Sequence, residues 1–119
     1  MFFFDTYAII EAFRGNPSYA RFFDHSFIIT HLNVGEFYAY LLRNYSKSEA
    51  EAWLGEVAFT IVPMDNEIVK LATEFKMENN KKELSWADCI GYIASIKLGL
   101  KFLTGDSQFR GMPDVEFVK

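Results

Sequence analysis

The chain has 119 residues, of which 50% are hydrophobic and 18% aromatic, and its formal net charge is −4. This length predicts one domain over residues 1–119, and the acidic balance argues against a protein that coats nucleic acid, which needs a basic surface. The opening MFFF lacks the basic lead of a signal peptide, and no apolar run approaches the ~20 residues that span a bilayer. We therefore expect a cytoplasmic protein with no membrane contact, some of whose aromatic surface meets a partner.

Short apolar stretches alternate with helical patterns in the first half of the chain. The patterns and the residues that begin or end them predict a strand at Phe2–Phe4, a helix that begins at Asp5 and Thr6 and ends at Arg14–Pro17, and a short helix from Ser18 to about Phe23. They then predict a strand at Phe27–Ile29, a helix from His31 to about Tyr45, and a helix with a capping box of Ser48 and Glu51. The strand at Phe2–Phe4 is expected to be buried.

The second half continues the alternation. It predicts a strand at Thr60–Val62, a helix capped by Asp65, a polar loop over Glu78–Glu83, a helix capped by Ser85 and ended by Gly99, a strand at Phe102–Thr104, and a last strand at Val115–Val118. Strands separated by helices indicate an α/β fold. We expect three layers, α/β/α, around a mostly parallel sheet.

Four acidic residues are predicted to meet at one edge of that sheet. Asp5 and Asp106 directly follow apolar strands, Glu36 lies in the first turns of a helix after a strand, and Asp88 opens a helix. Ligands of such sheets bind beyond the carboxyl ends of the strands. Carboxylates crowded together need a counter-charge, and oxygen ligands favour Mg²⁺ or Mn²⁺.

Each acid also has a structural interpretation, which the sequence leaves open for that residue alone. Asp5 could cap the first helix, and Asp88 could interact with a helix dipole. Glu36 could be a solvated helix residue, and Asp106 could belong to an ordinary turn. Only their joint placement beside one edge favours a metal site.

Other kinds of site are not supported by the residue pattern. His25 and His31 show no zinc-ligand spacing with each other or with Cys89, which is predicted to be a small core residue. The chain has no phosphate-binding glycine loop and no Ser/His/Asp pattern typical of a nucleophilic enzyme.

Three stretches together resemble a PIN-domain ribonuclease, and in particular the VapC-type toxins of toxin–antitoxin pairs. They are the apolar strand ending in Asp5 and Thr6, Glu36 within NVGEFYAYLLR, and LSWADCIGYIASIKLGLKFLTGDSQF. The resemblance covers nearly the whole chain in order and spacing. Its most specific part is the last stretch, which contains Asp88 and Asp106.

The resemblance implies a Mg²⁺- or Mn²⁺-dependent endoribonuclease that cleaves RNA, with four metal-binding and catalytic acids: Asp5, Glu36, Asp88 and Asp106. It also implies supporting hydroxyls at Thr104 and Thr6, a homodimer, and an antitoxin partner bound in a groove near the site. Many members carry a further acid two residues after the position that matches Asp106. This chain has Gln108 there, which argues against a fully occupied second metal site.

Two other functions stay open. A PIN-like module that binds RNA or protein without cleaving it is favoured by the aromatic excess and by Gln108. A receiver-like signalling domain would need an Asp at the end of its central strand, whereas the third predicted strand ends at Val62 and Pro63 and Asp65 is better explained as a helix cap.

Overall fold

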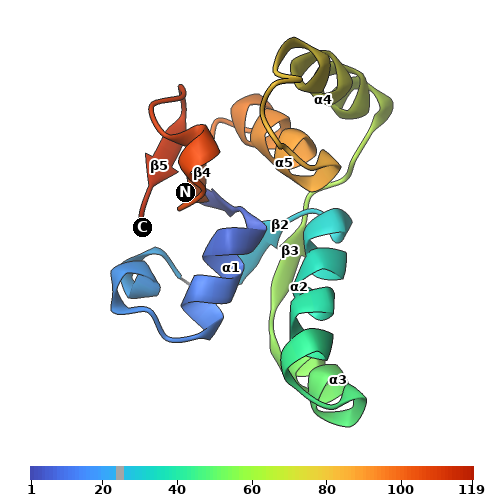
Figure 1. The fold of residues 1–119 in the computed structure, drawn as a ribbon, viewed down its shortest axis with the longest axis vertical. Helices are drawn as coiled ribbons and strands as arrows, with labels where there is room; N and C mark the ends of the chain where they lie inside the picture. Colours follow the sequence, from blue (N-terminus) through green and yellow to red (C-terminus); the bar gives the residue numbers. More distant parts are fainter. Residues whose placement is uncertain (24–25) are drawn as a thin grey trace.

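Five short strands form one sheet at the centre of the computed structural model, which describes residues 1–23 and 26–119 (Figure 1). They are β1 (Phe2–Phe4), β2 (Phe27–Ile29), β3 (Phe59–Ile61), β4 (Lys101–Thr104) and β5 (Val115–Phe117). Their order is β3-β2-β1-β4-β5, and all neighbours are parallel. The predicted sheet is confirmed. Its order differs from the 2-1-3-4-5 order of receiver domains, so that alternative is wrong.

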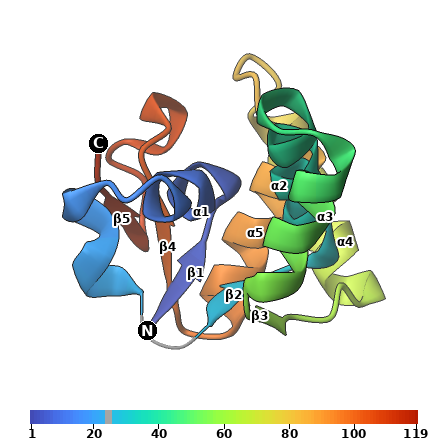
Figure 2. The same cartoon turned by 90° about the horizontal axis from the view of Figure 1, so that it is seen from below.

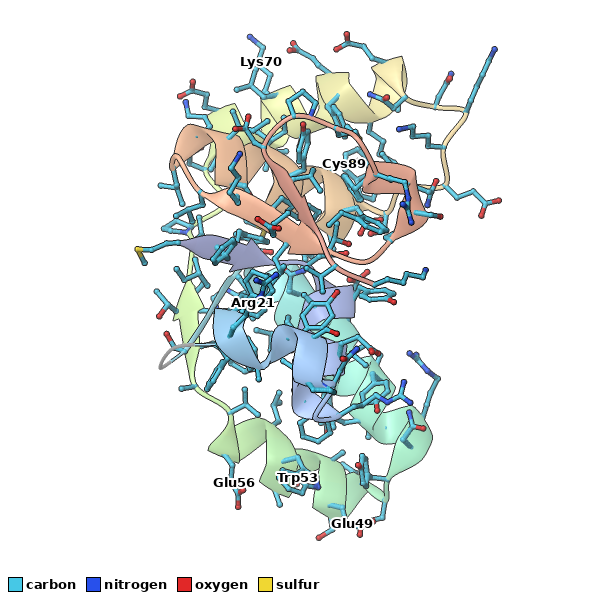
Figure 3. All side chains as sticks on the ribbon, turned by 90° about the vertical axis from the view of Figure 1, so that its left-hand side faces the viewer. Arg21, Glu49, Trp53, Glu56, Lys70 and Cys89 are labelled. Carbon is cyan, nitrogen blue, oxygen red and sulfur yellow. The ribbon has the colours of Figure 1, made fainter. Side chains whose placement is uncertain are left out.

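Helices cover both faces of the sheet, which makes the three predicted layers (Figure 1). On one face lie α1 (Thr6–Phe13), the 3₁₀ helix η1 (Pro17–Phe22), α2 (His31–Asn44) and α3 (Lys47–Glu56), and on the other lie α4 (Asn66–Glu78) and α5 (Trp86–Lys97). A short 3₁₀ turn, η2 (Ser107–Phe109), follows β4. Figure 3 shows Lys70 on α4 and Trp53 on α3 at opposite ends of the molecule, with Cys89 between them.

The alternation of side chains along the strands divides the core into two halves. Phe3 and Phe102 point to the α4–α5 side, where their rings stack at 5.9 Å, whereas Phe4 and Leu103 point to the α1–α2 side. Helix α5 approaches the sheet closely at Gly91, because a Cβ atom there would lie 2.7 Å from the Phe3 ring. Cys89 is buried in this half of the core, as predicted.

Most predicted helix ends are confirmed. Asp65 caps α4, Ser85 caps α5 in a capping box with Asp88, and Gly99 adopts a φ of 68°, the left-handed conformation that favours glycine.

The start of α3 and the form of η1 differ from prediction. The α3 capping box is Ser46 with Glu49, so the predicted pair of Ser48 and Glu51 is wrong. Both pairs fit the same S-x-x-E pattern, and the earlier start carries Ala50 into a fully buried position. The helix predicted from Ser18 is a 3₁₀ helix that begins at Pro17, after the cap residue Asn16.

Two further predictions concern the membrane and zinc. Within residues 1–23 and 26–119, no helix combines the length and the apolar character needed to cross a membrane. His25, one of the two histidines considered as a zinc ligand, lies outside the described residues, and His31 is the first residue of α2.

Candidate functional site

The strand order places a topological switch point between β1 and β4. From β1 the sheet continues to β2 and β3 on one side, and β4 and β5 continue it on the other (Figure 2). Open parallel sheets bind ligands at such a point, beyond the carboxyl ends of the strands. Asp5 directly follows β1, and Asp106 follows β4 by two residues. We call this end of the sheet the carboxyl edge.

The other two predicted acids reach the same edge from helices. Helix α2 begins at His31, immediately after Thr30 ends the link from β2, so its first turns, with Glu36, lie at the carboxyl edge. Helix α5 leads through a tight turn into β4 and therefore runs back across the sheet, which puts its N-terminal turn, with Asp88, at that edge. The fold thus brings the four predicted acids to one end of the sheet.

Asp5 is the buried centre of this group, with a relative exposure of 3%. Its carboxylate accepts hydrogen bonds from the Thr6 amide at 2.8 Å and from the Thr104 hydroxyl at 2.6 Å. The Thr104 oxygen in turn accepts a bond from the Asp106 amide at 3.0 Å. Thr104 therefore joins two of the acids, one from each side of the switch point.

The electrostatics show that these carboxyl groups act on one another. Burial, followed by the charge of Asp88, raises the pKa of Asp5 from its ordinary 3.8 to about 8, and Asp106 contributes in the same direction. The hydrogen bonds from Thr104 and Thr6 oppose this rise in the pKa. Burial also raises the pKa of Asp88, with further contributions from the charges of Glu36 and Asp106. Asp88, Asp106 and Glu36 each raise the pKa of another acid of the group.

A buried asparagine, which the sequence analysis did not identify, organises the Glu36 side of the site. Asn33 is fully buried and accepts hydrogen bonds from the Thr30 amide and hydroxyl, both at 3.0 Å. Its Nδ2 donates to the Thr6 hydroxyl at 3.0 Å, and that hydroxyl donates to Glu36 Oε1 at 2.6 Å. Asn33 therefore orients Thr6 toward Glu36. Its position three residues after the cap residue Thr30 could have indicated the capping box, but not the contact with Thr6.

Asp5, Asp88 and Asp106 also have the structural roles that the sequence left open. Asp5 is the N-cap of α1, through the bond from the Thr6 amide. Asp88 Oδ2 accepts from the Ser85 amide at 2.8 Å, and Asp106 Oδ1 accepts from the Gln108 amide at 3.0 Å as the cap of η2. Capping uses one oxygen of each carboxylate in these bonds and fixes the direction of the side chain. A cap and a ligand position are therefore compatible in the same residue.

The residues fit a hard divalent cation in charge and in donor type. Within residues 1–23 and 26–119, no three acidic, His or Cys side chains stand as a ready-made ligand group. In the same part of the chain, however, none of the four acids forms a salt bridge, and Glu36 and Asp106 each keep one carboxylate oxygen without a hydrogen-bond donor. These oxygens and the repulsion around Asp5 are what a cation would satisfy.

Comparisons with known proteins address the family and the fold. A family model described as "PIN domain" matches residues 2–115 of the chain. Among curated protein sequences, none matches.

Three solved structures share the fold along their whole length. A toxin–antitoxin complex from Klebsiella pneumoniae superposes with a TM-score of 0.75 at 18% identity, covering 98% of this chain and 96% of that one. VapBC2 from Rickettsia felis, bound to a DNA fragment from its promoter, gives 0.73 at 12% identity, with 98% and 96% covered. The Sarcin-Ricin loop cleaving toxin VapC20 of Mycobacterium tuberculosis gives 0.69 at 16% identity, with 98% and 99% covered.

Proposed function

Because this chain belongs to the PIN-domain family, we propose that it is a Mg²⁺- or Mn²⁺-dependent endoribonuclease and the toxin of a toxin–antitoxin pair. The observation that carries the proposal is the carboxyl edge, where Asp5, Asp88, Asp106 and Glu36 come together at the switch point of the sheet. The printed descriptions of the similar structures, which name toxin–antitoxin complexes and a Sarcin-Ricin loop cleaving toxin, support the choice of RNA as substrate and of an antitoxin as partner.

We assign the ion to Asp5, Asp88 and Asp106, with Glu36 binding it directly or through water. When bound, the ion supplies positive charge that makes water more acidic and offsets negative charge on the scissile phosphate. Thr104 fixes the position of the Asp5 carboxylate relative to the Asp106 backbone through its two hydrogen bonds. Thr6, oriented by Asn33, does the same for Glu36.

The burial of Asp5 suits this assignment. A carboxyl group that is nearly inaccessible to water and surrounded by other acids is costly to ionise, and a bound dication removes that cost. The acidic edge also explains why an acidic chain could handle RNA, since the charge that meets the phosphate would be that of the ion. We further propose that the protein is cytoplasmic and forms a homodimer.

The direct test is to incubate the purified protein with RNA and Mn²⁺, with and without EDTA. We expect cleavage that the chelator abolishes, and loss of cleavage in Asp5→Asn and in Asp106→Asn while circular dichroism shows the fold retained. Asp65→Asn is the matched control, because Asp65 also caps a helix but lies outside the acidic group. Undiminished cleavage by Asp5→Asn would show that the site is assigned wrongly.

The second candidate is a PIN-like module that binds RNA or protein without cutting it. Two half-exposed tryptophans, Trp53 at 41% and Trp86 at 47% relative exposure, offer it apolar contact surface. Saturable RNA binding with no product at any Mn²⁺ concentration would favour this module over the nuclease.

A further inference from the structure

Gln108 occupies a position where many PIN-domain proteins have an acid. Both polar atoms of its side chain form hydrogen bonds with the backbone of Glu83. Its side-chain Oε1 accepts a hydrogen bond from the Glu83 amide at 2.5 Å, and its Nε2 donates to the Glu83 carbonyl at 3.1 Å. The Gln108 carbonyl accepts a third bond from Lys82 Nζ at 2.9 Å. One residue of η2 thus binds the segment between α4 and α5. We call the two side-chain hydrogen bonds between Gln108 and Glu83 the Gln108 clamp.

The two segments joined in this way carry two of the proposed metal ligands. On one side, the Gln108 amide donates to Asp106 Oδ1. On the other side, Glu83 lies two residues before Ser85, whose amide donates to Asp88 Oδ2. Gln108 is therefore the link in a continuous path from Asp106 to the capped N-terminus of α5 and Asp88.

Only an amide side chain of this length can make both bonds. A carboxylate can accept from the Glu83 amide but has no hydrogen to donate to the Glu83 carbonyl, and two oxygens would then face each other. A glutamate at position 108 would therefore lose one bond and gain a repulsion. The chemistry of the clamp explains a glutamine at this position without any metal contact by Gln108 itself.

We propose that Gln108 is a positioning residue that fixes Asp88 relative to Asp106 and thereby sets the affinity of the carboxyl edge for its ion. The part that concerns the ion rests on the proposed function, whereas the clamp does not. Residues that hold metal ligands in place typically contribute 10–100-fold to metal affinity or activity. We expect an effect of about that size from the loss of the clamp.

The first measurement is hydrogen exchange on the metal-free protein. Gln108→Met keeps the length of the side chain and removes both hydrogen bonds, so we expect faster exchange at the amides of Glu83 and Asp88. Asn79→Ala is the matched control: it removes a 2.9 Å side-chain bond to the Phe75 carbonyl at the start of the same connection, without touching η2. That control should leave the exchange at Asp88 unchanged.

The second measurement is Mn²⁺ affinity by calorimetry, together with RNA cleavage kinetics. Gln108→Met should bind Mn²⁺ about 10–100-fold more weakly and lower kcat, with the KM for RNA nearly unchanged, whereas Asn79→Ala should match the wild type. Gln108→Glu should also speed exchange at Asp88, because it loses the donor to Glu83.

The outcomes separate the two proposals. Unchanged exchange at Asp88 in both Gln108 variants would overturn the clamp, and faster exchange with unchanged Mn²⁺ affinity would overturn its role in metal binding. If the wild-type protein neither binds Mn²⁺ nor cleaves RNA, the proposed function fails, and the exchange data still decide whether Gln108 holds the start of α5.

Discussion

The two ends of the same five-stranded sheet differ sharply in chemistry. At the carboxyl edge, Asp5 follows β1 and Thr30 follows β2 directly, and both belong to a connected polar group that also contains Thr6, Asn33 and Thr104. At the amino edge, where the strands begin, lies an open apolar hollow of about 410 Å³, lined by Met1, Phe2, Phe4, Phe22, Ser26, Ile28 and Thr60. β1 and β2 contain only apolar residues, whereas β3, β4 and β5 also contain polar ones. The carboxyl ends of β1 and β4 therefore carry candidate chemistry, while their buried side chains supply packing.

The largest expected effect is a loss of stability on mutation of Phe4, a packing residue. Its neighbour Asp5, which belongs to the carboxyl edge, should show no such loss. Phe4 is 2% exposed and packs edge-on against Phe27 at 4.9 Å. Phe4→Ala should lower the free energy of unfolding by about 3–5 kcal/mol, because it removes a buried ring and leaves a cavity. Urea denaturation measures this, and a loss below about 1 kcal/mol would contradict the packing. The neighbouring Asp5→Asn should cause no such loss.

The next effect is a dependence of protein stability on pH, caused by the acids of the carboxyl edge. The pKa of Asp5 is about 8 in the folded protein and 3.8 ordinarily, so between these values the folded state holds a proton that the unfolded chain releases. The metal-free protein should therefore be most stable below about pH 4 with respect to this group, and lose that stability as the pH rises toward 8. Asp88, whose pKa is also raised, acts in the same direction.

Thermal unfolding in EDTA across this pH range tests the sign. In the wild type, Tm should fall as the pH rises. Asp5→Asn should remove much of this decrease, so that its Tm exceeds that of the wild type by at least about 5 °C near pH 8. A wild-type Tm that rises with pH over this window would contradict the buried, repelled state of Asp5.

A smaller effect should follow from a single hydroxyl. Thr104→Val keeps the shape of the side chain but removes the donor to Asp5 and the acceptor for the Asp106 amide. Mn²⁺ binding measured by calorimetry should weaken about 10–100-fold, as for other residues that orient metal ligands. Equal affinities in Thr104→Val and the wild type would remove Thr104 from the site.

The smallest effect is expected at the amino edge. Ser26 and Thr60 share a 2.5 Å hydroxyl–hydroxyl bond that is exposed to solvent. Ser26→Ala should cost about 1 kcal/mol or less in unfolding free energy and leave the rate of RNA cleavage unchanged. A loss of cleavage would show that the two edges are coupled, against the division described above.

Sequence patterns predicted the features that depend on neighbouring residues. The apolar strands, the Ser85 cap with Asp88, and the Gly99 stop are local and were confirmed. The convergence of four acids was predicted because parallel strands all end at the same edge, which is a property of the fold class.

The features that the sequence did not reveal depend on distant partners. Asn33 looks like an ordinary helix residue until Thr6 is placed beside it, and the Gln108 clamp requires the backbone of Glu83, 25 residues away. The misplaced α3 cap had a different cause. Two overlapping S-x-x-E patterns had equal local merit, and only the burial of Ala50 against the core distinguishes them.

The central pair of strands has a consequence for the order in which the protein is made. β1 and β4 lie side by side, although Asp5 and Thr104, which bond to each other, are 99 residues apart in the chain. Chains are synthesised from the N-terminus, and such distant pairing is completed late in folding. On a translating ribosome, Asp5 therefore has no partner from β4 until the chain through Thr104 has emerged. If the protein is the ribonuclease proposed above, its nascent chain lacks an active site until that point in its synthesis.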